Sequence, residues 1–296
     1  MRLGDIAKNS CLNLKMISEE ELDNLHKVLL IMLDDLLKIC EEFGLHFILI
    51  GGSAIGALRE KGFIPWDDDI DIAMPRRDFE TLYMVIEEKY SDKYSILHPK
   101  SEDNYGRILP KIRMKGTEYR TILEYDLNES GVFIDIYTIE NIPDLKIARF
   151  AQGVMCMFMG FGLSCRRMFK GYKVFKNYQG GISFKVKTII GAILSFASLE
   201  KWAKWTNYWY SKCKDEKTKY VGVPADDFHY FGEIYKRNEF CKYLSVDFEG
   251  RKCFVPSNYD PYLKRRYGEY MTSPDKNGHQ RNLYLAYDLG KYNKEV

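Results

Sequence analysis

The sequence of 296 residues lacks the features that mark several large classes of protein. Its 44 basic and 42 acidic side chains nearly balance, so no strong overall charge draws it to nucleic acid. None of its seven cysteines forms a C-x-x-C pair, which gives a structural zinc or redox site little support. An odd number of unpaired cysteines suits a reducing cytoplasm, and Met1–Asp5 lacks the apolar core of a signal peptide. We therefore expect a cytoplasmic protein that binds no nucleic acid.

Uninterrupted apolar stretches are also short. Phe150–Cys165 is uncharged over sixteen residues and Thr188–Leu199 over twelve, whereas a membrane-spanning helix needs about twenty apolar residues. Ten basic side chains and one acid lie between Arg149 and Lys204. This composition fits either a helical pair with a solvated basic face or a peripheral contact with an anionic membrane surface. In the second case, five aromatic side chains would lie near the headgroups: Trp202, Trp205, Tyr208, Trp209 and Tyr210.

What the sequence does contain is a glycine-rich turn followed by paired aspartates. The apolar run Phe47–Ile50 predicts a buried strand that enters a tight turn at residues 51–53. Asp69 and Asp71 alternate with isoleucines, so on a strand both carboxylates face one side. Two carboxylates this close repel unless a proton or a cation lies between them, and Mg²⁺ prefers oxygen ligands plus phosphate. The pattern indicates metal-dependent transfer of a phosphate-containing group.

A third aspartate supports this interpretation. Asp135 lies in the middle of the β-branched and aromatic run Val132–Tyr137, where an unpaired buried charge would cost several kcal/mol. A neighbouring strand that brings it beside Asp69 and Asp71 would let it bind metal or act as a general base. Simpler interpretations exist for each part alone, because a Gly-Gly-Ser turn is often only a turn and an acidic run is often a solvated loop.

The order of predicted elements suggests a small mixed sheet backed by helices, with an added helical region. Ser18 and Glu21 match a capping box that starts a helix ending at Gly44. Further predicted elements follow in sequence: strands at 47–50, 69–73, 94–98, 107–113 and 132–137, helices at 54–59 and 77–89, a hairpin around Glu249-Gly250, and a helix up to Tyr267. We expect a catalytic core at 1–146, a basic helical insertion at 147–219 and an aromatic C-terminal segment at 220–296.

The segments Ile50–Arg59 and Gly62–Ile72 closely resemble the LicD family, bacterial phosphocholine transferases related to fukutin and the fukutin-related protein. Three weaker segments follow in the same order: Pro110–Arg113, Val132–Ile136, and Phe248–Gly250 with Tyr267–Met271. The middle of the chain shows no such resemblance. Tyr137–Glu140 departs from the aromatic-proline-apolar-acid run that relatives tend to carry, which leaves the local turn open.

The resemblance implies a nucleotidyltransferase fold of the α+β class and transfer of a phosphoryl-linked alcohol. The donor is often CDP-choline, and the acceptor is a sugar hydroxyl of a cell-surface polymer such as lipopolysaccharide or teichoic acid, or of its lipid-linked precursor. The implied cofactor is Mg²⁺ or Mn²⁺, with Asp69 and Asp71 as ligands and Asp135 as the third acid. Asp67 lies two residues before Asp69, so it would share the same strand face and reach the same cation. Such a protein would work at the inner face of the plasma membrane.

The resemblance also implies how the donor is held. Gly51, Gly52 and Ser53 would bind the diphosphate through backbone N–H groups and the hydroxyl. Lys111 and Arg113 lie two residues apart, so one strand face would present both cations to the diphosphate; a solvated edge strand is the simpler interpretation.

Three other functions use parts of the same pattern. A nucleotidyltransferase would pass a nucleoside monophosphate to a small acceptor with the same three carboxylates. A glycerol- or ribitol-phosphate transferase would differ only in the alcohol. An inactive membrane-associated scaffold is the non-enzymatic alternative, and it does not explain why all three aspartates are present.

Overall fold

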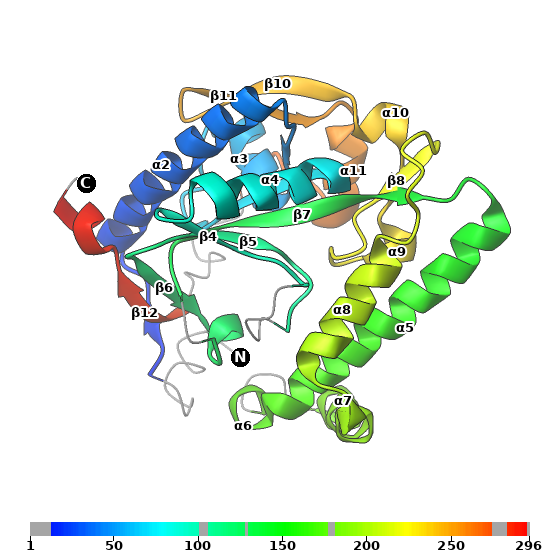
Figure 1. The fold of residues 1–296 in the computed structure, drawn as a ribbon. Coiled ribbons are helices and arrows are strands. Elements are labelled where there is room, and N and C mark those ends of the chain that lie inside the picture. The colour runs from blue at the N-terminus through cyan, green and yellow to red at the C-terminus, as the bar shows by residue number, and fades with distance from the viewer. Residues whose placement is uncertain (1–12, 101–105, 128–129, 177–180, 274–282, 295–296) are drawn as a thin grey trace.

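The computed structural model describes residues 13–100, 106–127, 130–176, 181–273 and 283–294 (Figure 1). Its centre is a mixed sheet in the order β2–β3–β7–β5–β4, extended by β8 and β9 from the second half of β7. The strands are β2 (Ile48–Leu49), β3 (Ile70–Pro75), β4 (Tyr94–Leu97), β5 (Lys111–Met114), β7 (Phe133–Ile142), β8 (Tyr220–Gly222) and β9 (Ile234–Lys236). β3 and β7 run parallel, and the other pairs are antiparallel. The predicted fold class, a mixed sheet backed by helices, is confirmed.

Three helices complete what we call the sheet core, the seven-stranded sheet with α2 (Glu19–Phe43), α3 (Gly51–Arg59) and α4 (Arg76–Lys89). α2 begins with the predicted capping box, in which the Ser18 hydroxyl accepts from the Glu21 N–H and the Glu21 carboxylate accepts from the Ser18 N–H. It ends at Gly44, whose φ of 65° is the left-handed conformation that glycine adopts readily. The leucine stripe of α2 is buried against the sheet.

Smaller elements surround the sheet core. A second sheet joins strands from both ends of the described chain, in the order β1 (Lys15–Met16), β12 (Leu283–Asp288) and β6 (Glu118–Thr121). The predicted hairpin is confirmed as β10 (Tyr243–Phe248) and β11 (Arg251–Pro256), and α11 (Tyr259–Tyr267) follows it. Short helices around the sheet core include α9 (His229–Gly232), α10 (Arg237–Phe240) and 3-10 turns at Ile122–Glu124 and Gly290–Lys294.

Three predicted boundaries differ from the structure by three residues or more. α3 begins at Gly51 and not at Ala54, so the glycine turn and the first turn of the helix coincide; Gly51 has a φ of +55°. β5 begins only at Lys111, after Pro110, which has no N–H to donate to a neighbouring strand. β7 continues through Tyr137–Glu140 to Ile142 because β8 pairs with its second half. The departure from the family pattern therefore lies within a strand.

The basic middle segment forms the helical lobe, residues 146–210. It consists of α5 (Lys146–Lys170), α6 (Tyr172–Phe175), α7 (Ile182–Ile193), a 3-10 turn (Leu194–Phe196) and α8 (Leu199–Tyr210). In the view of Figure 1, α5 and α8 lie below the second half of β7, with α6 and α7 at the bottom. Two of the five aromatic side chains that the membrane-contact interpretation placed at lipid headgroups are buried, since Trp202 is 2% and Tyr210 5% exposed. Trp202 packs within the lobe, and Tyr210 packs against Cys156 of α5 together with Ile142 of β7 and Tyr230 of α9.

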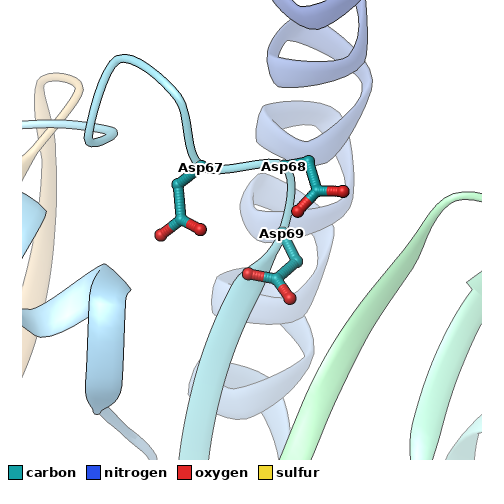
Figure 2. Close-up of side chains that lie close together, drawn as sticks. All are labelled: Asp67, Asp68 and Asp69. Carbon is teal, nitrogen blue, oxygen red and sulfur yellow. The ribbon is translucent and has the colours of Figure 1, made fainter. Parts of the chain in front are cut away.

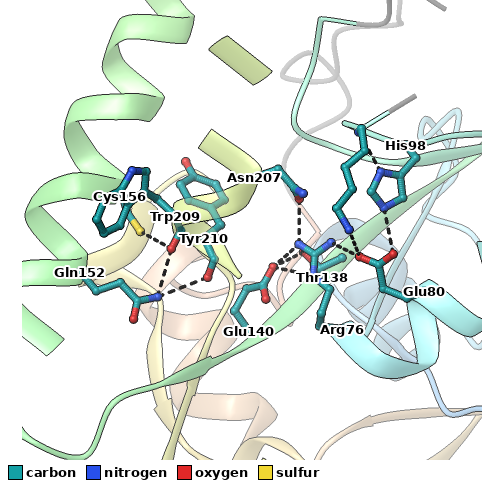
Figure 3. A network of polar contacts seen from close by, with 11 residues as sticks. Arg76, Glu80, His98, Thr138, Glu140, Gln152, Cys156, Asn207, Trp209 and Tyr210 are labelled. Carbon is teal, nitrogen blue, oxygen red and sulfur yellow. Dashed lines mark hydrogen bonds and ion pairs between the residues drawn. The ribbon is translucent and has the colours of Figure 1, made fainter. Parts of the chain in front are cut away.

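A polar network joins the helical lobe to the sheet core (Figure 3). The Arg76 guanidinium of α4 donates to Glu140 of β7 and, at 3.1 Å, to Asn207 of α8. It also reaches Thr138 at 3.1 Å and Glu80 at 3.4 Å. The Glu140 side chain is only 1% exposed. Because Arg76 is its cationic partner there, this one residue satisfies a buried carboxylate and fixes the lobe against the sheet.

By length and composition, α5 is long and apolar enough to cross a membrane. Only 28% of its apolar window is buried within the described part of the protein. The segment from Ile182 to Phe196 and α8 pass the same test together, but they are bent by 94°. The uncharged run at 150–165 is shorter than a membrane span. α5 is longer than this run because the helix also includes charged residues before position 150 and after position 165.

Candidate active site

Asp71 and Asp135 are direct neighbours on the two parallel strands at the centre of the sheet. The register of β3 against β7 pairs Asp71 with Asp135, while the adjacent Ile70 pairs with Ile134. Asp69 immediately precedes β3 on the same side as Asp71. One carboxylate oxygen from each of Asp69, Asp71 and Asp135 lies within 4.8 Å of the others. The structure therefore brings together the three acids that the sequence pattern singled out.

Burial and mutual repulsion make these carboxylates difficult to ionise together. Burial raises the pKa of Asp69 well above its usual range, and the charges of Asp71 and Asp67 raise it further. The pKa of Asp71 is raised in the same way by burial and then by Asp135. Burial also raises the pKa of Asp135, although Lys111 acts in the opposite direction. A positive charge among the three would reverse this repulsion.

A second acidic group adjoins the first at the entry to β3. Figure 2 shows Asp67 and Asp68 on either side of Asp69, and oxygens of all three lie within 4.8 Å of one another. Burial, followed by the charge of Asp68, raises the pKa of Asp67 to about 7. Asp68 accepts a hydrogen bond from the buried Tyr119 hydroxyl of β6. Asp68 was not predicted as a site residue, because on an extended chain its side chain would point to the face opposite that of Asp67, Asp69 and Asp71.

The loop that carries Asp67 is supported by α2. The Nε2 atom of His26 lies 2.7 Å from the Asp67 carbonyl oxygen. A carbonyl oxygen only accepts, so this ring nitrogen carries the proton. The His26 ring also stacks on Phe63 with centroids 3.9 Å apart. Burial lowers the pKa of His26 and so favours the neutral imidazole. Nothing in the local sequence identified this support, because it comes from a residue 41 positions away.

The glycines at the start of α3 leave room for the carboxylates. A Cβ atom at Gly52 would lie 2.3 Å from Asp67 Oδ2, and one at Gly51 would lie 3.0 Å from Asp71 Oδ2. Ser53 is 3% exposed, and its hydroxyl accepts from the Asp71 N–H at 2.9 Å. The Gly51 N–H donates to the Tyr262 hydroxyl at 3.2 Å. Gly51 and Ser53 thus position the acidic strand; their role in holding a diphosphate stays a prediction.

Lys111 and Arg113 both lie in an interior strand and not at a solvated edge. Lys111 is the register partner of Asp135 across β5 and β7, and its Nζ lies 2.8 Å from Asp135 Oδ1. The same Nζ lies 3.6 Å from Glu124, and Arg113 donates to Glu124 at 2.8 Å. Both cations thus share a face, as predicted. The buried Glu124, which the sequence gave no reason to choose, accounts for Arg113 and leaves Lys111 in contact with the acidic group.

A cleft of about 610 Å³ opens onto this site. One wall comes from α3 and the acidic loop, including Arg59 and Trp66, and the other from the C-terminal segment, including Tyr267, Glu269 and Tyr270. Residues more than 190 positions apart along the chain therefore enclose the aspartates. This wall was predicted only in outline, since the aromatic C-terminal residues carry no local signal of their partners.

The donor set fits a divalent cation. Three carboxylates converge from β3 and β7, and oxygen ligands of this kind are those that Mg²⁺ and Mn²⁺ prefer. In the absence of a cation, their charges raise one another's pKa values. A cation among Asp69, Asp71 and Asp135 would remove that repulsion, whereas an apolar or anionic ligand would not. The acidic groups can therefore hold a metal ion, whose identity the geometry does not define.

Comparisons with known proteins agree with this geometry. Residues 44–145 match the nucleotidyltransferase domain of the LicD/FKTN/FKRP family. This range contains both β3 and β7 and every predicted site residue. The chain is also similar to the lipopolysaccharide cholinephosphotransferase LicD of Haemophilus influenzae, with 26% identity over 273 residues. That alignment covers 88% of this chain and 96% of the relative. Residues 44–145 are thus similar to the nucleotidyltransferase domain of the LicD/FKTN/FKRP family, and most of the chain is similar to a cholinephosphotransferase of that type.

Proposed function

We propose that this protein is a phosphotransferase that moves phosphocholine from CDP-choline to a sugar hydroxyl of a cell-surface glycan or its lipid-linked precursor. The observation that carries the proposal is the convergence of Asp69, Asp71 and Asp135 beside a cleft of about 610 Å³, which Asp69 and Asp71 line. The relative from Haemophilus influenzae, a lipopolysaccharide cholinephosphotransferase, supports choline as the alcohol and a glycan as the acceptor.

The proposed reaction exchanges one phosphate ester for another. An oxygen–phosphorus bond forms between the acceptor hydroxyl and the phosphorus atom that carries choline. The bond from that phosphorus to the bridging oxygen of the diphosphate breaks, and CMP leaves with the electron pair. The hydroxyl proton must be accepted by a base within hydrogen-bond reach of the attacking oxygen. Asp135 is our candidate for this base.

Lys111 distinguishes Asp135 from the other two aspartates. The Lys111 ammonium lies 2.8 Å from the Asp135 carboxylate. Among the described residues, neither Asp69 nor Asp71 forms an ion pair with a lysine or arginine. The Lys111 contact favours the ionised carboxylate, which can accept a proton, and it fixes the orientation of one oxygen. Lys111 thereby acts as a positioning residue in the proposal, and Arg113 acts through Glu124.

Asp69 and Asp71 would hold Mg²⁺ or Mn²⁺, with Asp67 at the margin of the site. Such an ion neutralises charge on the transferred phosphoryl group and the leaving nucleotide. The glycine-lined start of α3 would let donor phosphates approach the acids, because no side chain projects from Gly51 or Gly52. In this proposal residues 1–146 perform the chemistry and residues 220–296 close the cleft.

We further place the protein in the cytoplasm at the inner face of the plasma membrane. All six cysteines within the described residues are free thiols, which suits a reducing compartment; Cys11 and the Met1–Asp5 segment lie outside those residues. A lipid-linked glycan precursor would be reached most directly from a protein that contacts the bilayer.

The decisive experiment incubates the purified protein with an acceptor glycan and CDP-choline labelled either in choline or in cytidine. Phosphocholine transfer predicts that the choline label reaches the glycan and that CMP is released. A nucleotidyltransferase would instead place cytidine on the acceptor, and that outcome would replace the proposal. Parallel reactions with CDP-glycerol and CDP-ribitol identify the alcohol. Chelation followed by Mg²⁺ or Mn²⁺ addition tests the metal.

A thermal-shift series separates binding from turnover. A donor that binds the folded state raises the melting temperature by mass action, even if the acceptor chosen is wrong. CDP-choline should therefore stabilise the protein more in the presence of Mg²⁺ than in its absence. A protein that ignores every CDP-alcohol under both conditions would favour the inactive-scaffold alternative.

A further inference from the structure

The outer face of α5 is apolar along most of its length. Large apolar side chains recur every three or four residues and stay 45–78% exposed: Ile147, Phe150, Val154, Phe158 and Phe161. This spacing places them on one side of the helix. Buried positions of the helix that contact α8 carry smaller side chains, such as Cys156 against Trp209 and Gly162 against Trp202. The usual amphipathic pattern of a surface helix is therefore reversed in α5, because its largest apolar side chains face outward.

α7 and its terminal 3-10 turn show the same reversal. Their exposed apolar residues recur every three or four positions and are 46–82% exposed: Ile182, Val186, Ile189, Ile193 and Phe196. Only Phe184 and Gly191 are buried within the helix. Ile189 is 63% and Ile193 71% exposed, values that a core-facing stripe would not show.

Packing directs both stripes toward the same side of the lobe. At 3.6 residues per turn, Gly191 lies on the side of α7 opposite to the Ile182–Phe196 stripe. A Cβ atom at Gly191 would lie 2.1 Å from the Cys165 carbonyl oxygen and 2.7 Å from Phe169 Cβ. Cys165 and Phe169 continue the helical face of α5 that carries Ile147 to Phe161. α7 therefore crosses the end of the α5 stripe and turns its own apolar stripe outward.

Ten large apolar side chains exposed on adjoining helices form the kind of contiguous apolar surface that marks an interaction site. The charges around them indicate what covers them. Residues 149–204 contain ten basic side chains and one acid, and the exposed Lys185 flanks the α7 stripe. Two copies of so basic a surface would repel each other, whereas a bilayer with anionic headgroups complements both the charge and the apolar face.

We propose that the outer faces of α5 and α7 form a docking surface for an anionic lipid bilayer. The two helices lie in the plane of the interface, with Phe158 and Ile189 among the inserted side chains. Lys185 contacts the headgroups, and the exposed Trp205 and Tyr208 of α8 are the aromatic residues that remain available near them. The inference rests on exposure and charge in the helical lobe and does not depend on the chemistry proposed for the sheet core.

Vesicle sedimentation of the full-length protein tests this surface. Wild type should bind vesicles of phosphatidylglycerol mixed with phosphatidylcholine, bind phosphatidylcholine alone much less, and lose part of the binding as salt rises. The double variant Phe158→Ser, Ile189→Ser should partition at least about tenfold less, because two inserted apolar side chains are removed. Lys185→Glu should lower binding to anionic vesicles by a smaller factor.

The matched control removes equally exposed apolar groups from the sheet-core side of the molecule. Met84 is 53% and Leu244 45% exposed, and Met84→Ser with Leu244→Ser should sediment like wild type.

Equal vesicle binding by the lobe variant and wild type overturns the proposal. So does failure of wild type to bind anionic vesicles at low salt, or a wild-type dimer that the lobe variant converts to monomers. Alkaline carbonate should release the bound protein; retention would assign α5 as a membrane span and overturn docking in the plane.

Discussion

The sheet core and the helical lobe distribute polar and apolar groups in opposite ways. In the sheet core, leucine, isoleucine and valine fill the interior, and the exception is a group of aspartates buried at the cleft. In the lobe, the large apolar side chains of α5 and α7 are outside, and glycine, cysteine and glutamine occupy much of the inner face of α5. Each region thus departs from the usual pattern at one place.

The two departures differ in energetic character. Buried carboxylates lower the stability of the folded protein unless a cation or proton compensates their charge. The acidic site is therefore destabilising without a ligand and stabilising once a cation binds. Exposed apolar side chains cost little in the folded monomer but lower solubility until a surface covers them. The comparison therefore predicts that substitutions at the aspartates mainly affect turnover and that substitutions on the lobe stripes mainly affect location.

The largest effect is expected for Asp71→Asn. A neutral amide cannot supply the charge that holds a cation, so turnover should fall by at least about a hundredfold, in line with the several kcal/mol that metal ions contribute. Because Asp71 is repelled by Asp135 in the free protein, the variant should unfold at a temperature no lower than wild type. Product formation at saturating Mg²⁺ and calorimetric melting are the measurements.

Asp92→Asn is the matched control, since Asp92 is exposed in a turn away from the cleft; it should keep full activity. The metal assignment fails if Asp71→Asn turns over at a comparable rate, or if Mg²⁺ stabilises the variant as much as it stabilises wild type.

Asp135→Asn should slow the chemical step more than it weakens donor binding. A general base acts in the transition state and typically contributes about 10²–10⁴-fold. Single-turnover rates should therefore fall by roughly that factor, whereas the donor Kd should change by less than about threefold. If donor affinity collapses while the rate constant is unchanged, Asp135 is a binding ligand and the proton goes elsewhere.

The junction between the two regions gives the largest expected stability effect. Arg76→Met leaves Glu140 as a buried carboxylate without its cation, which typically costs about 3–5 kcal/mol. Adding Glu140→Gln should recover part of this loss because the unpaired charge disappears. Urea unfolding measures both variants. The neighbouring Arg77 is 75% exposed in its pair with Glu216, and Arg77→Met should change the free energy of unfolding by less than about 0.5 kcal/mol.

A small loss for Arg76→Met would mean that water or another group reaches Glu140, and that the lobe is attached less rigidly than the contacts indicate. If the double variant has the same free energy of unfolding as Arg76→Met, the loss comes from packing and hydrogen bonds and not from the unpaired charge.

Much of the sheet core was predictable because its signals are local. The alternation of Asp69, Ile70 and Asp71 already defines which side chains face the cleft, and Ser18 with Glu21 defines the start of α2. Parallel pairing of β3 with β7, which makes Asp71 and Asp135 neighbours, was required by the hypothesis but had no local signal of its own.

Residues supplied by distant elements could not be found in this way. Glu124, Tyr119 and His26 each contact a site residue through tertiary packing, and none has a distinctive local pattern. The lobe shows the opposite difficulty. Ile182 to Phe196 has a clear helical period, but periodicity alone does not say whether the stripe faces inward or outward. Trp202, which only the membrane-contact interpretation placed near headgroups, is buried.

The smallest expected effects come from two glycines of α3, and they separate function from stability within one helix. Gly56→Ala would place a Cβ 2.3 Å from the Gly62 carbonyl oxygen, so backbone must move, and we expect a loss of about 1–3 kcal/mol in the free energy of unfolding. Gly52→Ala would meet only the end of the Asp67 side chain, also at 2.3 Å, which can rotate away. We therefore expect a stability change below about 1 kcal/mol, together with a higher Mg²⁺ concentration for half-maximal activity if Asp67 helps to hold the cation. Urea unfolding and a Mg²⁺ titration of activity distinguish the pair. An unaltered Mg²⁺ requirement in Gly52→Ala would remove Asp67 from the proposed metal site and leave Asp69 and Asp71 as its ligands.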